Sequence, residues 1–176
     1  ITEDEHVSVV PTDRKGIGAL KNFACHQCVG DVLVELDHDD TLASNAFIEL
    51  AAAYIKAPAG FYYSDFINLK PDGTCETYGK KFGWETYPCE VDGQKYVACR
   101  AFEPSARSIC QITYAPNPVR AWSKKAYMAT GGHDVNLPVG DDHELVCRTY
   151  LAGVPFVLIN KPIYIYRRYS GNSFVE

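Results

Sequence analysis

Apolar residues along the first half of the chain follow strand spacing and helix spacing in turn. The runs at 32–36 and 61–69 are rich in Val, Leu, Ile and aromatic residues and are typical of buried strands. Between them, residues 45–55 place apolar side chains at helical spacing, on one face made of Phe47, Ile48, Ala51, Ala52 and Ile55. Ser44 stands before this segment as a candidate N-cap. We therefore expect a strand, an amphipathic helix and a second strand, in that order.

The other periodic segments continue this alternation. We expect a short buried strand at 6–11, a last strand at 156–166, and helices at 19–28, 121–129 and 143–151. Turn signals in the less regular region 71–101 predict a small antiparallel excursion. Alternating strands and helices predict an α/β fold with a mostly parallel sheet flanked by helices. A length of 176 residues suits a single domain over residues 1–176.

Charge and composition then exclude several classes of protein. A net charge of −5 disfavours nucleic acid as a partner, because phosphate backbones are bound by clustered Lys and Arg. No run reaches the roughly 18 uninterrupted apolar residues of a transmembrane segment, and the acidic residues 1–5 do not resemble a signal peptide. Seven cysteines without an export signal indicate reduced thiols. We expect a cytoplasmic protein, either free in the cytoplasm or peripheral to a membrane.

An acidic cluster follows the first predicted strand directly. Asp37, Asp39 and Asp40 crowd carboxylates together, and such charges repel unless a cation neutralises them. In open α/β sheets, ligands bind beyond the carboxyl ends of strands, where this cluster would lie. The pattern predicts a divalent cation, Mn²⁺ or Mg²⁺, held by one or two carboxylates and by substrate phosphates. The alternative is a solvated acidic loop that caps the next helix.

A second acidic pair lies before the last predicted helix, after the sequence Gly131-Gly132-His133-Asp134. Asp141 and Glu144 have the spacing of a capping box, so Asp141 could be a simple N-cap. Asp142 would then lie in the first helical turn, where peptide dipoles keep a carboxylate ionised and able to accept a proton. We therefore interpret Asp142 as a candidate general base, with a surface acid near the helix dipole as the alternative.

Five stretches together resemble family 2 glycosyltransferases, in the family's order and over nearly the whole chain. They are residues 18–22, 30–40, 63–66, 131–134 and 141–145. The resemblance implies a GT-A-like, Rossmann-like fold and a nucleotide-sugar donor. It also implies that Asp37, Asp39 and Asp40 bind the metal and the donor diphosphate, that Lys21 in the first stretch belongs to the donor site, and that Asp142 is the base with Asp141 beside it.

The chain departs from the family pattern in two places. The family's opening strand and acidic loop, which hold the nucleoside, have no counterpart before His6, so we expect a partial GT-A domain with an N-terminal segment or further domains elsewhere. Near the end, Tyr169 takes the place where many relatives have a histidine that completes the metal site. The phosphates would then depend on Arg167 or Arg168 as charge-assisted donors.

The sequence therefore predicts transfer of a sugar from a nucleoside-diphosphate donor to a hydroxyl of a saccharide or other acceptor. Inversion at the anomeric carbon is implied by the resemblance alone. Asp142 would deprotonate the acceptor, and a cation at Asp37 and Asp39 would stabilise the leaving diphosphate. Two alternatives remain: a metal-dependent nucleotidyltransferase or phosphotransferase that uses the same acids, and a non-catalytic remnant that only binds carbohydrate.

Overall fold

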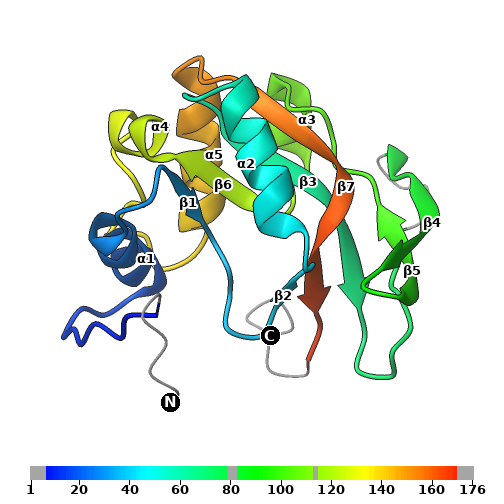
Figure 1. Ribbon diagram of the computed structural model, residues 1–176. Helices are drawn as coiled ribbons and strands as arrows, with labels where there is room; N and C mark the ends of the chain where they lie inside the picture. The colour runs from blue at the N-terminus through cyan, green and yellow to red at the C-terminus, as the bar shows by residue number, and fades with distance from the viewer. Residues whose placement is uncertain (1–6, 79–82, 113–114, 170–176) are drawn as a thin grey trace.

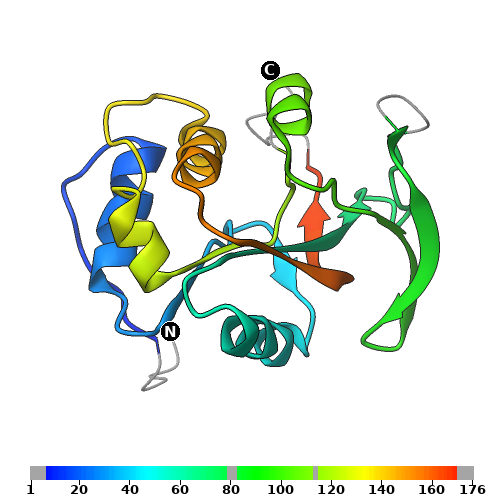
Figure 2. The ribbon, with the colours of Figure 1, turned by 90° about the horizontal axis from the view of Figure 1, so that it is seen from above.

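The computed structural model describes residues 7–78, 83–112 and 115–169. Its described part contains a mixed seven-stranded sheet with helices on both faces (Figures 1 and 2). The strands are β1 (Val32–Val34), β2 (Thr41–Leu42), β3 (Phe61–Leu69), β4 (Thr86–Val91), β5 (Gln94–Cys99), β6 (Arg120–Ser123) and β7 (Phe156–Arg167). The helices are α1 (Ile17–Gln27), α2 (Ala46–Lys56), α3 (Ala106–Gln111), α4 (Lys124–Ala129) and α5 (Asp141–Leu151).

The pairing of the strands corrects the expected mostly parallel sheet. The order is β1-β6-β3-β5-β4, with β7 beside β3 and β2 beside β7. In the described residues only β3 and β7 pair in parallel; the other neighbours are antiparallel. Because β6 is antiparallel to both β1 and β3, these two strands run in the same direction with β6 between them. The local pattern predicted the direction of β1 and β3, but not the later strand that separates them.

Two hydrophobic clusters lie on the two faces of the sheet. Figure 2 shows α2 on one face and α5 on the other. The first cluster joins α2 to the sheet through Leu50 and Ala53. The second joins α5 to the sheet through Leu145 and Val146, which pack with Trp122 of β6. Residues from distant segments are therefore fixed on the α5 face, where the candidate site is found.

The helix α2 is where the sequence predicts it, but it buries a different face. Phe47, Ile48 and Ile55 are 69%, 72% and 76% exposed. The side chains that face the sheet are Ala46, Leu50 and Ala53. Nearly every position of this helix is apolar, so spacing alone does not tell which face is buried. The expected N-cap is also wrong: Asn45 precedes the helix, and the Ser44 hydroxyl instead bonds to Asp92.

Other elements agree with the expected pattern or correct it. The strands β3 and β7, the helices α1 and α5, and the antiparallel β4–β5 hairpin lie where the sequence predicts them. The predicted helix at 121–129 is instead β6 followed by α4, with the Ser123 side chain as N-cap. The expected strand at 6–11 is wrong for residues 7–11, which are exposed and have no regular structure, while His6 lies outside the described residues.

None of the helices in the described ranges combines the length and the apolar character needed to cross a bilayer.

Candidate functional site

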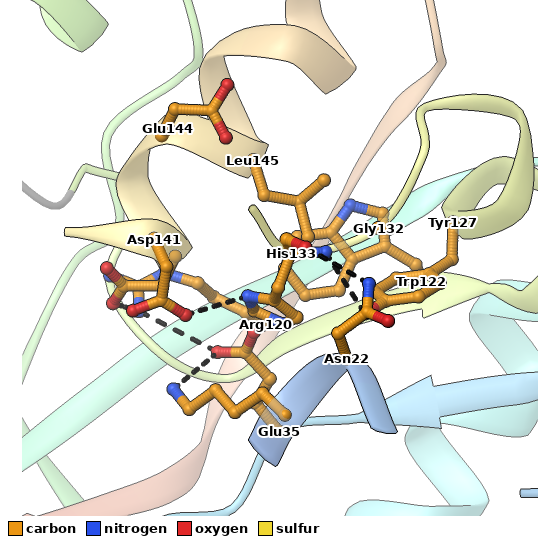
Figure 3. A network of polar contacts seen from close by, with 12 residues as sticks. Asn22, Glu35, Arg120, Trp122, Tyr127, Gly132, His133, Asp141, Glu144 and Leu145 are labelled. Carbon is orange, nitrogen blue, oxygen red and sulfur yellow. Dashed lines mark hydrogen bonds and ion pairs between the residues drawn. The ribbon is translucent and has the colours of Figure 1, made fainter. Parts of the chain in front are cut away.

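The candidate site forms where three segments meet on the α5 face of the sheet. They are the acidic loop after β1, the Gly131–Asp134 loop after α4, and the first turn of α5 (Figure 3). The backbone N–H of Glu35 donates to the carbonyl of Arg120, which extends the β1–β6 pairing by one residue toward the site. The structure therefore brings the two acidic groups that the sequence singles out to the same place.

Close contact between α1 and the Gly131–Asp134 loop closes one side of the site. A Cβ at Gly18 would lie 2.3 Å from the carbonyl oxygen of Asp134, so any larger residue would push α1 away. The Asn22 side chain donates to the carbonyl of His133 at 3.0 Å. Gly132 has a positive φ of 66°, in the left-handed region that glycine adopts without strain, and this turn directs His133 inward.

Asp142, the predicted base, forms a short ion pair with Arg120. The carboxylate oxygen Oδ2 lies 2.5 Å from the guanidinium, and Oδ1 accepts the backbone N–H of His143 at 2.7 Å. Burial raises the pKa of Asp142, but Arg120 and Lys21 outweigh it, so the net pKa is lowered. Burial likewise opposes the charge of Arg120, but Asp142 and Glu35 raise its pKa. Both groups are therefore charged at neutral pH.

Asp141 has a different role from the N-cap that the sequence suggests. Gly140 is the N-cap, in the left-handed conformation, and the structure shows no side-chain capping bond there. The carboxylate of Asp141 is instead 2.9 Å from Nδ1 of His133 and is buried. The capping-box interpretation is wrong because the buried histidine takes the carboxylate inward, away from the free N–H groups of the helix.

His133 lies between two carboxylates and is fully buried. Its Nε2 is 2.7 Å from Glu35, and its Nδ1 faces Asp141. Both contacts are ion pairs when the imidazole is protonated. Burial lowers the pKa of His133, but the two carboxylates outweigh it and raise the pKa to about 9. The imidazole is therefore a cation at neutral pH.

Lys21 links the acidic loop to the acid pair of α5. Its ammonium is 3.5 Å from Glu35 and 3.5 Å from Asp37. Burial lowers the pKa of Lys21, but Glu35, Asp37 and Asp142 raise it more. A lysine that the sequence placed in the donor site thus lies beside both predicted acidic groups.

Asp40 holds the acidic loop to β7. Its two carboxylate oxygens accept the hydroxyl of Tyr164 at 2.6 Å and the backbone N–H of Arg167 at 2.8 Å. Burial raises the pKa of this carboxyl, and the two donated bonds oppose that rise. The Arg167 side chain donates to the carbonyl of Asp39 at 2.5 Å. Asp40 and Arg167 therefore fix the shape of the loop that presents Asp37 and Asp39.

The end of β7 places the two other residues that the sequence singled out. The Arg167 guanidinium lies over the Tyr169 ring, 5.5 Å from its centroid. Arg168 is paired with Glu76 instead of facing the acidic loop. Of the two arginines, only Arg167 is in contact with that loop.

The predicted cation site at the acidic loop is not a cluster of three side-chain ligands in the described residues. Across residues 7–78, 83–112 and 115–169, no three His, Cys, Asp or Glu side chains are grouped to hold a metal ion. Asp37 has a side chain that is 51% exposed, and Asp39 is half-buried. Both residues belong to one loop, and one or two carboxylates are the usual protein ligands of Mg²⁺, which completes its shell with phosphates and water.

Three charged residues that complete the site were not assigned by the sequence. Glu35 lies in the acidic run and also inside a predicted buried strand. A charged residue at a buried position needs a partner, so this position was the indication that the sequence offered. The sequence gives no indication of a role for Arg120, because this residue precedes a segment whose spacing predicts a helix. His133 is one of three histidines that the sequence places near the site as secondary candidates without a role, and its partner Glu35 comes from a segment distant in sequence.

Comparison with known proteins finds similarity in structure but not in sequence. No protein-family model matches the chain, and no curated protein matches it in sequence. Solved structures of S. aureus TarS, residues 1–349, do match it. The fold resembles that of TarS. The TarS structure without a named ligand matches with a TM-score of 0.60 and 17% identity over 90% of the chain.

Two further TarS structures contain nucleotides. The complex with UDP-GlcNAc matches with a TM-score of 0.63 and 18% identity over 94% of the chain, and the complex with UDP with 0.55 and 16% over 85%. The chain spans about two fifths of TarS 1–349, since 42% of the UDP-GlcNAc complex is covered. At this identity the likeness shows the fold, which is glycosyltransferase-like, and leaves the membership of family 2 as a prediction.

Proposed function

We propose that the chain is part of a GT-A-type glycosyltransferase that moves a sugar from a nucleoside-diphosphate donor to an acceptor hydroxyl, with inversion. The observation that carries this proposal is the convergence of the acidic loop and the α5 acid pair around Lys21 and Arg120. The likeness in fold to a protein solved with UDP-GlcNAc supports a nucleotide-sugar as the donor.

Asp142 is the proposed base. Arg120 keeps its carboxylate ionised, and the N-terminus of α5 favours the same charge. Its side chain is 16% exposed, so an acceptor can approach it, unlike the buried Asp141. A lowered pKa makes Asp142 a weaker base but keeps it able to accept a proton over a wide pH range.

Asp37 and Asp39 are the proposed donor-side ligands. A cation bound by them would neutralise the diphosphate as the bond to the sugar breaks. Lys21 lies 3.5 Å from Asp37 and supplies a second positive charge beside that position. Asp40 and Arg167 hold the loop in place, through the bond from the Arg167 backbone N–H to Asp40 and the bond from the Arg167 side chain to the Asp39 carbonyl.

The first experiment tests cation-dependent donor binding. We expect UDP-GlcNAc to raise the thermal unfolding temperature only when Mn²⁺ or Mg²⁺ is present, because a ligand that binds the native state stabilises it. Asp39→Ala should abolish this cation-dependent shift and leave the unfolding temperature of the free protein nearly unchanged, since it relieves repulsion among acids. Asp13→Ala, at an exposed position outside the site, is the matched control. Normal binding by Asp39→Ala would show that the metal assignment is wrong.

Product analysis separates the proposal from its alternatives. Release of labelled sugar from UDP-GlcNAc, dependent on Asp142, is expected of a glycosyltransferase. A nucleotidyltransferase or phosphotransferase would react at phosphorus without needing Asp142. A non-catalytic remnant would bind carbohydrate and release nothing.

A further inference from the structure

Apart from the half-exposed Asp37, which also contacts Lys21, the charges around His133 balance only when its imidazole is protonated. The buried or nearly buried carboxylates of the cluster are Glu35, Asp141 and Asp142, and its cations are Lys21, Arg120 and His133. The side chains of Glu35 and Asp141 are 11% and 4% exposed, so water screens them poorly. Without the charge of His133, three carboxylates would share two cations.

Arg120 connects this balance to the proposed base. Its guanidinium is 2.5 Å from Asp142 and 4.0 Å from Glu35, so both carboxylates interact with the same cation. His133 pairs with Glu35 from the other side, with its Nε2 2.7 Å from the carboxylate. If that partner were lost, Glu35 would attract Arg120 and Lys21 more strongly, and Asp142 would lose part of the field that keeps it ionised.

We propose that His133 is a positioning residue for the base: by neutralising Glu35 and Asp141 it keeps Arg120 on Asp142 and fixes the first turn of α5. This inference rests on the proposed function, in which Asp142 is the base. It assigns His133 no contact with substrate. Its action passes through Glu35 and Arg120 on one side and through the Asp141 backbone on the other.

Every element around the imidazole contributes a group to this balance. The groups are Glu35 after β1, Asp141 and Asp142 of α5, Tyr127 of α4, Arg120 of β6, and Lys21 of α1. Tyr127 accepts the backbone N–H of His133 through its hydroxyl, and burial raises its pKa, so it stays neutral in the range considered. Trp122 packs against the imidazole edge and excludes water.

The direction of the pH effect follows from the raised pKa of His133. A protonated histidine stabilises the folded protein when its pKa is higher in the folded than in the unfolded state. That contribution is complete below the ordinary pKa of 6.5 and is lost as pH rises through about 9. The coupling to Asp142 should therefore be intact at neutral pH and weaken in alkali.

Carboxyl titration by ¹³C NMR tests the coupling without requiring activity. His133→Asn should raise the pKa of Asp142, because Glu35 then competes for Arg120. Glu35→Gln should move it the opposite way, because Arg120 and Lys21 are left to Asp142 and Asp37. The control is His26→Asn: His26 is exposed on α1 and should leave the pKa of Asp142 where it is. If His133→Asn fails to fold, the Glu35→Gln titration still decides.

Kinetics supply a second readout in the same proteins. We expect His133→Asn to lower kcat for UDP-GlcNAc turnover by about tenfold or more at pH 6 while KM for the donor stays the same. A pKa of Asp142 that is equal in the wild type, His133→Asn and Glu35→Gln would overturn the inference. Shifts in the expected directions in a protein that does not turn over UDP-GlcNAc would support the coupling and overturn the proposed function.

Discussion

At the residue scale, Asp141 and Asp142 are neighbours in sequence with different surroundings. Asp141 is turned inward against His133, and its side chain is 4% exposed. Asp142 is turned toward Arg120, and its side chain is 16% exposed. A helix turns about 100° per residue, which is why adjacent side chains at its start can face two different environments. The first carboxylate is therefore enclosed by the protein, while the second, which belongs to the proposed base, is partly open to solvent.

The two aspartates can be separated by matched substitutions. Asp142→Asn keeps the size of the side chain but removes the proton acceptor, so we expect kcat to fall by about 10²-fold or more with donor affinity nearly unchanged. Asp141→Asn should instead destabilise the fold by about 1–3 kcal/mol, because it leaves His133 with one buried charge partner fewer. Turnover measurements and urea unfolding of both variants check this pair of expectations.

Equal and small losses of activity in the two variants would contradict it. The acid pair would then be a structural helix start, and the base would have to be Asp134 or an acid outside this chain. A stability of Asp141→Asn equal to that of the wild type would show that the contact with His133 contributes little.

The aspartates of the site and Lys21 could be predicted from the sequence, but the roles of Glu35, Arg120 and His133 could not. Acids that follow a buried strand or begin a helix stand at positions with a known meaning in a local pattern. Arg120 and His133 acquire their role only from contacts with Glu35, Asp141 and Asp142, which come from other segments. Such long-range pairing leaves no periodic signal.

At the element scale, α2 shows what hydrophobic spacing can and cannot predict. The existence of the helix follows from a long apolar segment free of Gly and Pro, and its observed bounds, Ala46–Lys56, differ by one residue from the expected ones. Its orientation does not follow, because apolar residues occur on almost every side. The helix packs on the sheet with the face that carries Ala46, Leu50 and Ala53. The two alanines are small enough for the helix to approach the sheet closely.

This orientation can be tested with two substitutions to alanine on the same helix. Leu50 is 3% exposed, so Leu50→Ala should destabilise the fold by about 2–5 kcal/mol through loss of buried contacts and the cavity left behind. Ile48 is 72% exposed, so Ile48→Ala should change the free energy of unfolding by about 0.5 kcal/mol or less. Urea unfolding of both variants measures the difference. A larger loss for Ile48→Ala would mean that the face predicted by spacing is the buried one.

At the scale of the whole molecule, β1 ends the sheet next to an apolar hollow. In the described sheet, β1 pairs with β6 on one side and is the terminal strand of the order. A hollow of about 280 Å³ lies beside it, lined by Val32, Val34, Leu50 and other residues of β1 and α2. The solved TarS proteins are more than twice as long as the matched region, since 42% of the UDP-GlcNAc complex is covered. The matched region therefore covers less than half of TarS 1–349.

The last prediction concerns donor binding by the 176-residue chain by itself. Among the described residues, the roles proposed for the site are cation and diphosphate binding at Asp37 and Asp39 and proton transfer at Asp142, and none of them is contact with the nucleoside. We therefore expect the 176-residue chain by itself to bind UDP-GlcNAc weakly, with a Kd of about 10 µM or higher in the presence of Mn²⁺, which is about 7 kcal/mol of binding free energy or less. Isothermal titration calorimetry of the wild type measures this value, and Asp39→Ala shows whether the heat comes from the acidic loop. Submicromolar binding that disappears in Asp39→Ala would mean that the chain holds the whole donor, nucleoside included, and that the expected N-terminal segment is not needed for donor binding.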